Sequence, residues 1–166
     1  MNINISVIST KKEASFSFSF NEKIGSPGLD EVVFMTPVRL DGEVIKDKEI
    51  YYIDAKGSVG VKMYCSRCLE PTELLIDFNL NEKFNINESY DEEIEAFSGE
   101  SINLDLTVMD SILASLPMKV VCSDECKGLC LVCGQNLNET NCDCDTTVFD
   151  PRLEGLRSLL KFDEEV

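Results

Sequence analysis

Apolar and polar residues alternate along much of the first 85 positions, the pattern expected of half-buried β-strands. In the stretch ASFSFSF, serines separate the apolar residues Ala14, Phe16, Phe18 and Phe20. In ELLIDFNLNEKF, one face carries Leu74, Ile76, Phe78, Leu80 and Phe84, and the other carries Asp77, Asn79 and Asn81. Further strands are predicted at residues 31–40, 49–54 and 58–64, with a turn at Asp41-Gly42. The alternation predicts an antiparallel sheet rolled into a partial barrel.

Helical spacing replaces this alternation in two later stretches. In NLDLTVMDSILASLP, the predicted apolar stripe consists of Leu106, Met109, Leu113 and Leu116. Thr107 and Asp110 resemble a capping box with Asp in place of Glu or Gln, and Pro117 ends the helix. In DPRLEGLRSLLKF, Asp150 is the expected N-cap and Pro151 the first helical residue. The apolar face of that second helix consists of Leu153, Leu156, Leu159 and Leu160.

The predicted fold class is α+β and mainly antiparallel β. It combines a partial barrel-like sheet and one central helix with a zinc-ribbon-like cysteine cluster and a C-terminal amphipathic helix. Residues 1–121 are expected to form the β domain, with its helix near residues 105–115. Residues 122–149 would form a cysteine-rich metal-binding module, and residues 150–166 the C-terminal helix and tail. A length of 166 residues suits one ordinary domain with a small annex.

Two features of the sequence bear on where in the cell the protein is found. The first residues contain no apolar segment behind a basic one, so we expect no secretory signal. No window approaches 18 consecutive apolar residues, so we expect no membrane span. A cytoplasmic location follows. Since the cytosol keeps thiols reduced, the eight cysteines are better explained as metal ligands than as a disulfide framework.

The formal net charge of −16 restricts the partners that the protein can bind. Ten carboxylates and one lysine, Lys83, occupy the interval from Glu70 to Glu100: Glu70, Glu73, Asp77, Glu82, Glu88, Asp91, Glu92, Glu93, Glu95 and Glu100. Affinity for nucleic acid depends on clustered Lys and Arg, so we expect no tight direct binding to naked RNA. A direct RNA binder would need a basic face, for which the best candidates are Lys46, Lys48, Lys56 and Lys62.

The absence of histidine excludes several classes of enzyme. Without it there is no Ser-His-Asp triad, no Cys-His pair and no HExxH metalloprotease site. A zinc ion bound by four cysteines also lacks the open coordination position that catalytic zinc keeps for water. We therefore expect a protein that is not an enzyme.

The cysteines form four closely spaced pairs. Cys65 and Cys68 form a C-x₂-C, Cys122 and Cys126 a C-x₃-C, Cys130 and Cys133 a second C-x₂-C, and Cys142 and Cys144 a C-x-C. A C-x₂-C turn lets two thiolates face one ion, and two such arms complete a tetrahedral site. The spacing therefore predicts one or two structural Zn²⁺ ions.

Several assignments of these ligands remain open. Sequence locality favours grouping Cys130 and Cys133 with Cys142 and Cys144, because eight residues join the two arms. The other four cysteines would then clip the sheet to the segment after the helix. In a crossed arrangement, Cys65 and Cys68 join Cys130 and Cys133, as in a conventional zinc ribbon. An iron–sulfur cluster uses the same ligands, and a redox role for the Cys65–Cys68 pair is a further alternative.

The cysteine pairs and their neighbours resemble the YceD family over about residues 57–161. The matching motifs are Cys65-Ser-Arg-Cys68-Leu69-Glu70-Pro71, Leu116-Pro117, Cys130-x-x-Cys133-Gly134-x-Asn136-Leu137-Asn138 and Asp150-Pro151-Arg152-Leu153. The resemblance implies a non-enzymatic factor in large ribosomal subunit biogenesis and accumulation of 23S ribosomal RNA. It also implies that the pair shared by the family corresponds to Cys65 and Cys68.

Two hypotheses about function follow. In the first, the protein is an acidic adaptor that binds a basic ribosomal protein or a pre-ribosomal particle, because complementary potentials attract such partners. In the second, it is a metal- or redox-responsive regulator that uses its clustered thiolates. Exposure of the thiolates distinguishes the two, since buried structural sites resist alkylation. The oligomeric state is not predicted by the sequence.

Overall fold

The computed structural model describes residues 1–25, 27–28, 31–86 and 94–145. The chain forms two compact units, Met1–Cys65 with Glu70–Cys122, and Ser66–Leu69 with Ser123–Val166. The helix predicted for residues 150–166 lies outside the described residues, as do Asp91, Glu92 and Glu93 of the acidic stretch. In the part of the chain that is described, no helix is long and apolar enough to cross a membrane.

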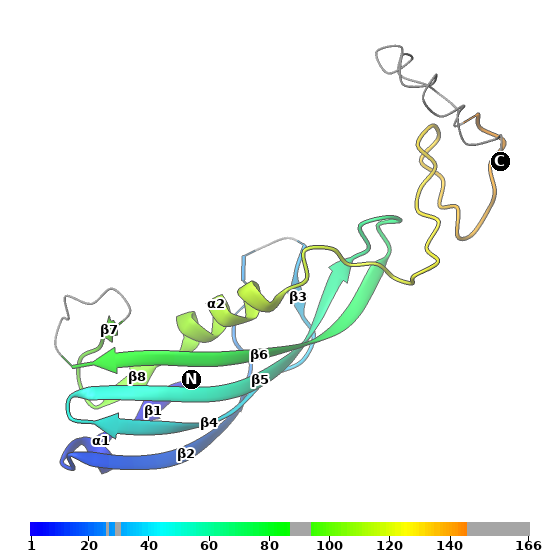
Figure 1. The fold of residues 1–166 in the computed structure, drawn as a ribbon. Helices are drawn as coiled ribbons and strands as arrows, with labels where there is room; N and C mark the ends of the chain where they lie inside the picture. Colours follow the sequence, from blue (N-terminus) through cyan, green and yellow to red (C-terminus); the bar gives the residue numbers. More distant parts are fainter. Residues whose placement is uncertain (26, 29–30, 87–93, 146–166) are drawn as a thin grey trace, which may run out of the picture. The chain divides into compact units, whose positions relative to one another are not determined.

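The first unit is built on a curled antiparallel sheet (Figure 1). Its strands are β2 (Glu13–Glu22), β3 (Val33–Phe34), β4 (Val38–Asp47), β5 (Ile50–Tyr64), β6 (Pro71–Asn85) and β7 (Ile94–Ala96). The strand order is β2-β4-β5-β6-β7, β3 pairs with β5, and the short β6–β7 pair is parallel. A separate pair joins β1 (Asn2–Asn4) to β8 (Ser101–Asn103). The predicted antiparallel, partly rolled sheet is confirmed.

The alternation of the sequence sets which side of each strand is buried. Along β6, Ile76, Phe78, Leu80 and Phe84 are buried, whereas Asp77, Asn79 and Asn81 are exposed. Along β2, the alanine and the phenylalanines are half-buried and the serines are exposed, as predicted. A strand's side chains change face at every residue, so only this register buries the whole apolar set.

The turn predicted at Asp41-Gly42 is wrong. Both residues lie inside β4, where Gly42 pairs with Ala55 of β5 and with Phe18 of β2. A Cβ atom at Gly42 would lie 2.4 Å from the Ala55 Cβ and 2.5 Å from a backbone oxygen. The glycine is therefore required by close packing of neighbouring strands. The chain turns at Lys48 instead, whose φ is 59°.

The central helix α2 (Asp105–Ser115) has its predicted bounds, but it buries a different face. Its fully buried apolar residues are Val108 and Ile112, in line with the buried Leu104, while the predicted Leu106 is 79% exposed. β8 ends at Asn103, and the next residue, Leu104, is buried. The chain therefore enters α2 in an orientation that fixes which side of the helix faces the core. Apolar residues lie on both stripes, so spacing alone could not select between them.

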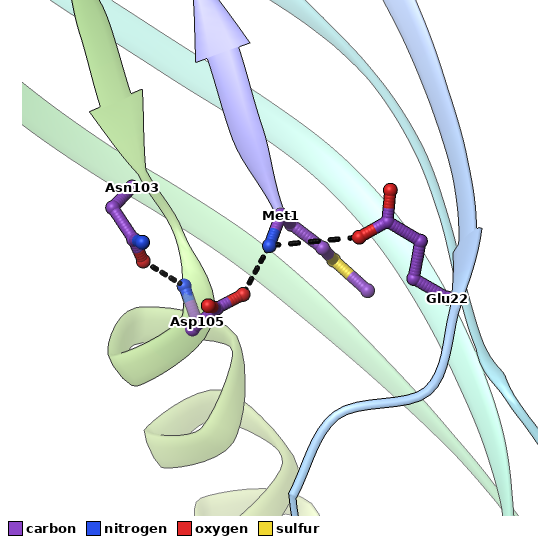
Figure 2. A network of polar contacts seen from close by, with 4 residues as sticks. All are labelled: Met1, Glu22, Asn103 and Asp105. Carbon is purple, nitrogen blue, oxygen red and sulfur yellow. Dashed lines mark hydrogen bonds and ion pairs between the residues drawn. The ribbon is translucent and has the colours of Figure 1, made fainter.

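The start of α2 differs from the predicted capping box at Thr107. The helix begins two residues earlier, and Asn103 Oδ1 accepts a hydrogen bond of 2.8 Å from the Asp105 N–H. The Asp105 carboxylate contacts the Met1 amino group, which lies 3.6 Å from Glu22 Oε2 (Figure 2). An acidic side chain in the first turn also suits the partial positive charge of the helix N-terminus.

A second, short helix α1 (Ser6–Ser9) was not predicted. It accepts a hydrogen bond from Lys46, one of the four lysines considered above for a basic RNA-binding face. Lys46 is only 7% exposed; its ammonium donates a 2.5 Å hydrogen bond to Ser9 O and lies 5.4 Å from the centroid of the Tyr51 ring. Lys56 is exposed on the opposite face of the sheet. The four candidates therefore do not form one basic face.

Gly42→Ala should destabilise the intact chain by about 1–3 kcal/mol, because neighbouring backbone cannot move aside for the added methyl group. Gly25→Ala is the matched control, since nothing lies within 4 Å of a Cβ at that position. Urea-induced unfolding, followed by circular dichroism, measures both. Equal stabilities for the two variants would contradict the close approach of β4 and β5.

Candidate metal centres

Two groups of four cysteines each bring their sulfur atoms together. In one group, the sulfurs of Cys65, Cys68, Cys122 and Cys126 all lie within 4.8 Å of one another. In the other, the same holds for Cys130, Cys133, Cys142 and Cys144. Among the described residues, these are the groups of metal-ligating side chains that converge in this way. We call them the first and the second cluster.

Both clusters fit the dimensions of a metal site. Four sulfurs bonded tetrahedrally to one ion at about 2.3 Å are separated by about 3.8 Å. The observed limit of 4.8 Å allows that geometry after movements of an ångström or less. A donor set made only of thiolates favours soft or borderline ions, such as zinc or the irons of an iron–sulfur cluster. Each cluster could therefore hold one metal ion.

The first pair of ligands lies in the loop of the long β5–β6 hairpin. The strand ladder ends at Tyr64 and Pro71, so the six intervening residues form the loop. The Cys65 N–H donates a 2.8 Å hydrogen bond to Glu70 O, which closes the loop at its base. Leu69 has a φ of 62°, a strained value for leucine that turns the chain back toward β6. The sulfur of Cys65 also accepts a hydrogen bond of 3.4 Å from the Cys122 N–H.

Two polar side chains of the second unit organise the chain around Cys126. Arg67 Nη1 donates to Asp124 O and Cys126 O, at 3.1 and 2.9 Å. Asn138 Nδ2 donates to Cys126 Sγ at 3.4 Å, and its Oδ1 accepts from the Lys127 N–H at 2.8 Å. Partners of this kind orient a ligand and reduce the charge on its sulfur. They connect Cys126 to the segment that surrounds the second cluster.

The second cluster is built on a tight turn. Leu129 and Asn136 form an antiparallel bridge, and between them the Cys130 N–H donates to Gln135 O at 2.8 Å. The Gly134 N–H donates to Cys130 O at 2.9 Å, and Gly134 has a φ of +75°. Glycine after the C-x₂-C pair is thus explained by a left-handed backbone conformation that other residues adopt at a cost.

The thiols of the second cluster differ in acidity. Backbone hydrogen bonds from Cys133 and Val132, together with a hydrogen bond from the Cys142 thiol, lower the pKa of Cys130 to about 6. A hydrogen bond to Cys133, with burial, raises the pKa of Cys144 to about 12. These hydrogen bonds let one thiol ionise easily and another hold its proton. Four adjacent thiolates would also repel one another. A divalent cation would remove that repulsion and displace the remaining protons.

The structure brings all eight predicted residues into these clusters, in the grouping that sequence locality favoured. The crossed, conventional zinc-ribbon grouping does not occur. Binding of an ion to either cluster stays a prediction. Sequence reasoning missed the roles of Arg67 and Asn138, although both belong to the motifs C-x-R-C and N-L-N that accompany the cysteine pairs.

A mainly β protein with two four-cysteine clusters is the class that these features define. The model of the family "Large ribosomal RNA subunit accumulation protein YceD" matches residues 53–160, about two thirds of the chain. The chain belongs to the YceD family. The family match extends beyond both clusters, so the cysteine pairs lie within the matched region.

Individual proteins are also similar to the chain. The chain is similar to YlbN of Bacillus subtilis, with 27% identity over 158 residues, covering 90% of this chain and 91% of that protein. It is also similar to a chloroplastic protein of Arabidopsis thaliana named "Large ribosomal RNA subunit accumulation protein YCED homolog 1", with 26% identity over 141 residues. That match covers 66% of this chain and 44% of the Arabidopsis protein. No solved structure matches the chain.

Asn138→Asp should weaken metal binding at the first cluster by about 10- to 100-fold. The aspartate keeps the acceptor for the Lys127 N–H but replaces the donor to Cys126 Sγ with a negative oxygen. Binding at the second cluster should change little. Competition between the protein and a chromogenic chelator, with Co²⁺ as the spectroscopic probe, measures both affinities.

Asn79→Asp controls for the added charge, because Asn79 is exposed on the outer face of β6. The role assigned to Asn138 is wrong if the two variants bind Co²⁺ with equal affinity.

Proposed function

We propose that this protein is a non-enzymatic, cytoplasmic factor in large ribosomal subunit biogenesis that supports accumulation of 23S ribosomal RNA. It acts as an acidic adaptor that binds a basic ribosomal protein or a pre-ribosomal particle. Membership of the YceD family supports the ribosomal context, and a plant relative is named for large ribosomal RNA subunit accumulation. The net charge of −16 supports the basic partner. The absence of histidine supports a role without catalysis.

The ion proposed for both clusters is Zn²⁺ in a structural role. Zinc is redox-inactive and four thiolates leave it no open position, which suits the proposed non-enzymatic role. The cysteines of the first cluster are mostly buried: Cys65, Cys68 and Cys126 are each at most 5% exposed. Burial of charged thiolates is costly unless a cation compensates them, so the buried ligands favour an ion that stays bound.

One observation carries the proposal of a basic partner. On the outer face of the sheet, Glu43 of β4 lies directly opposite Asp54 of β5. Ser17 and Asn81 complete this row, so the row itself holds no basic side chain, while Lys56 and Lys83 lie in the two adjacent rows. Like charges that face each other across two strands destabilise a sheet. A cationic side chain of a partner would relieve this repulsion. The pair would then cost stability in the free protein and strengthen binding of the partner.

The rows on one side of the acidic pair are balanced, and the row on the other side carries Lys83 beside Ile45 and Tyr52. Asp41 faces Lys56, and Arg39 is separated from Asp77 only by Ser58. A localised pair of carboxylates would attract a single cationic side chain more than a phosphate backbone. Burial of Lys46 removes one of the basic residues on which binding of naked RNA would depend.

A metal- or redox-responsive regulator is the second candidate, favoured by the exposure of two ligands. Cys122 and Cys133 are exposed, one in each cluster. An exposed thiolate on a labile ion would react with oxidants or alkylating agents. Rapid alkylation of the metal-loaded protein at these two cysteines would favour the regulator, and resistance would favour structural zinc.

The double variant Glu43→Gln/Asp54→Asn should stabilise the fold by about 0.2–1 kcal/mol, since it removes a like-charge cross-strand pair without changing side-chain shape. The same variant should weaken association with pre-ribosomal particles several-fold in about 0.1 M salt, and less at high salt. Urea-induced unfolding measures the first effect. Co-sedimentation of the purified chain with particles from cell extract measures the second.

The matched control is Glu49→Gln/Glu100→Gln, which removes the same charge at two other exposed positions of the first unit. A merely solvated acidic pair would show the gain in stability with no loss of association, and that result would refute the adaptor site. Tight binding of protein-free 23S ribosomal RNA fragments at physiological salt would contradict the adaptor itself.

A further inference from the structure

The strand β2 forms an edge of the large sheet that carries no obvious protection against pairing. Among the described residues it pairs with β4 on one side only (Figure 1). The seven residues from Ala14 to Phe20 include no charge, no glycine and no proline. Edge strands are usually guarded by lysine, proline or a bulge, because their unpaired backbone groups would otherwise bind another strand. This edge is therefore suited to accept one.

The direction of the free backbone groups follows from one hydrogen bond. The Lys48 N–H donates to Lys12 O at 3.0 Å, so the carbonyl of Lys12 points toward β4. Backbone groups change side at each residue of a strand, and the β2–β4 register is unbroken from Glu13 to Glu22. The outward N–H and C=O groups therefore belong to Glu13, Ser15, Ser17, Ser19 and Asn21.

The apolar face of β2 is also incompletely covered. Phe16, Phe18 and Phe20 are half-buried, whereas Val38, Leu40 and Val44 on the adjacent strand are fully buried. The Phe18 and Phe20 rings lie 5.5 Å apart and form a continuous apolar strip along the edge. A further strand beside β2 would cover the exposed part of this strip.

We propose that β2 pairs with β2 of a second copy of this chain, antiparallel about a two-fold axis at Phe18. This register places Phe18 opposite Phe18 of the second copy and Phe16 opposite Phe20 of the second copy. Glu13 then faces Lys23 of the second copy, and the symmetry repeats that attractive pair. The outward backbone groups of Ser17 meet those of Ser19, and those of Ser15 meet those of Asn21.

Charge and pleat together favour this register over its neighbours. A shift of the axis to the midpoint of Ser17 and Phe18 would place phenylalanines opposite serines and Glu13 opposite Glu22. An axis at Ser17 would keep phenylalanines opposite each other and place Lys12 opposite Glu22, but it would also place Lys11 opposite Lys23 and leave Glu13 opposite the uncharged Asn21. The edge is self-complementary in the Phe18 register, which favours a second copy over an unrelated strand.

Residue-resolved amide exchange on the full chain tests the pairing directly. At low concentration, the amides of Phe16, Phe18 and Phe20 should be protected by β4 while those of Ser15, Ser17 and Ser19 exchange fast. At high concentration, the serine amides should also become protected as sedimentation shows a dimer. A monomer at all concentrations, or a dimer whose serine amides exchange freely, would overturn the proposal.

Ser17→Pro removes an outward N–H and should abolish the dimer while leaving the β4 ladder intact, whereas Ser17→Thr should retain the dimer. Exchanging the charges of Glu13 and Lys23 tests the register independently of any folding defect. Glu13→Lys or Lys23→Glu alone should weaken the dimer roughly tenfold, and the two together should restore it. Single variants without effect, or a double variant no tighter than the singles, would exclude the Phe18 register.

Discussion

Repulsion among closely placed thiolates is the constraint on which the second unit depends. Its described part, residues 66–69 and 123–145, contains no helix and no strand beyond one isolated bridge, so little buried apolar surface orders it. A bound ion in a small metal module contributes on the order of 10–16 kcal/mol, comparable to the net stability of a whole domain. The hydrogen bonds from Arg67 and Asn138 orient the chain, but one guanidinium and one neutral amide do not balance the charge of four thiolates.

The first unit obtains its stability from a different source. Its core is a continuous apolar layer formed by one face of the sheet, the β1–β8 pair and the inner side of α2. The outer face of the same sheet lies away from this core, and it carries the like-charge pair of Glu43 and Asp54. A rigid sheet holds such charges at fixed spacing, which a loop would not do. The first unit thus carries both proposed surfaces, the acidic pair on the outer face of the sheet and the edge strand β2.

Sequence alone predicted the features that depend on local spacing. The faces of β2 and β6 follow from period-2 alternation, and the grouping of Cys130 with Cys144 follows from short separations along the chain. Features set by distant neighbours were missed. Asp41-Gly42 was predicted to form a turn, because the close packing that requires glycine at position 42 involves Ala55 on another strand. The buried stripe of α2 was misassigned because the approach from β8, rather than apolar content, sets its rotation.

Metal content and its removal test the central claim most directly. Native protein, purified without added metal, should contain two zinc ions per chain. Chelation should then abolish amide protection in residues 123–145, while β5 and β6 keep theirs. Less than about one metal ion per chain, with eight thiols that react freely and protection unchanged by the chelator, would contradict the account.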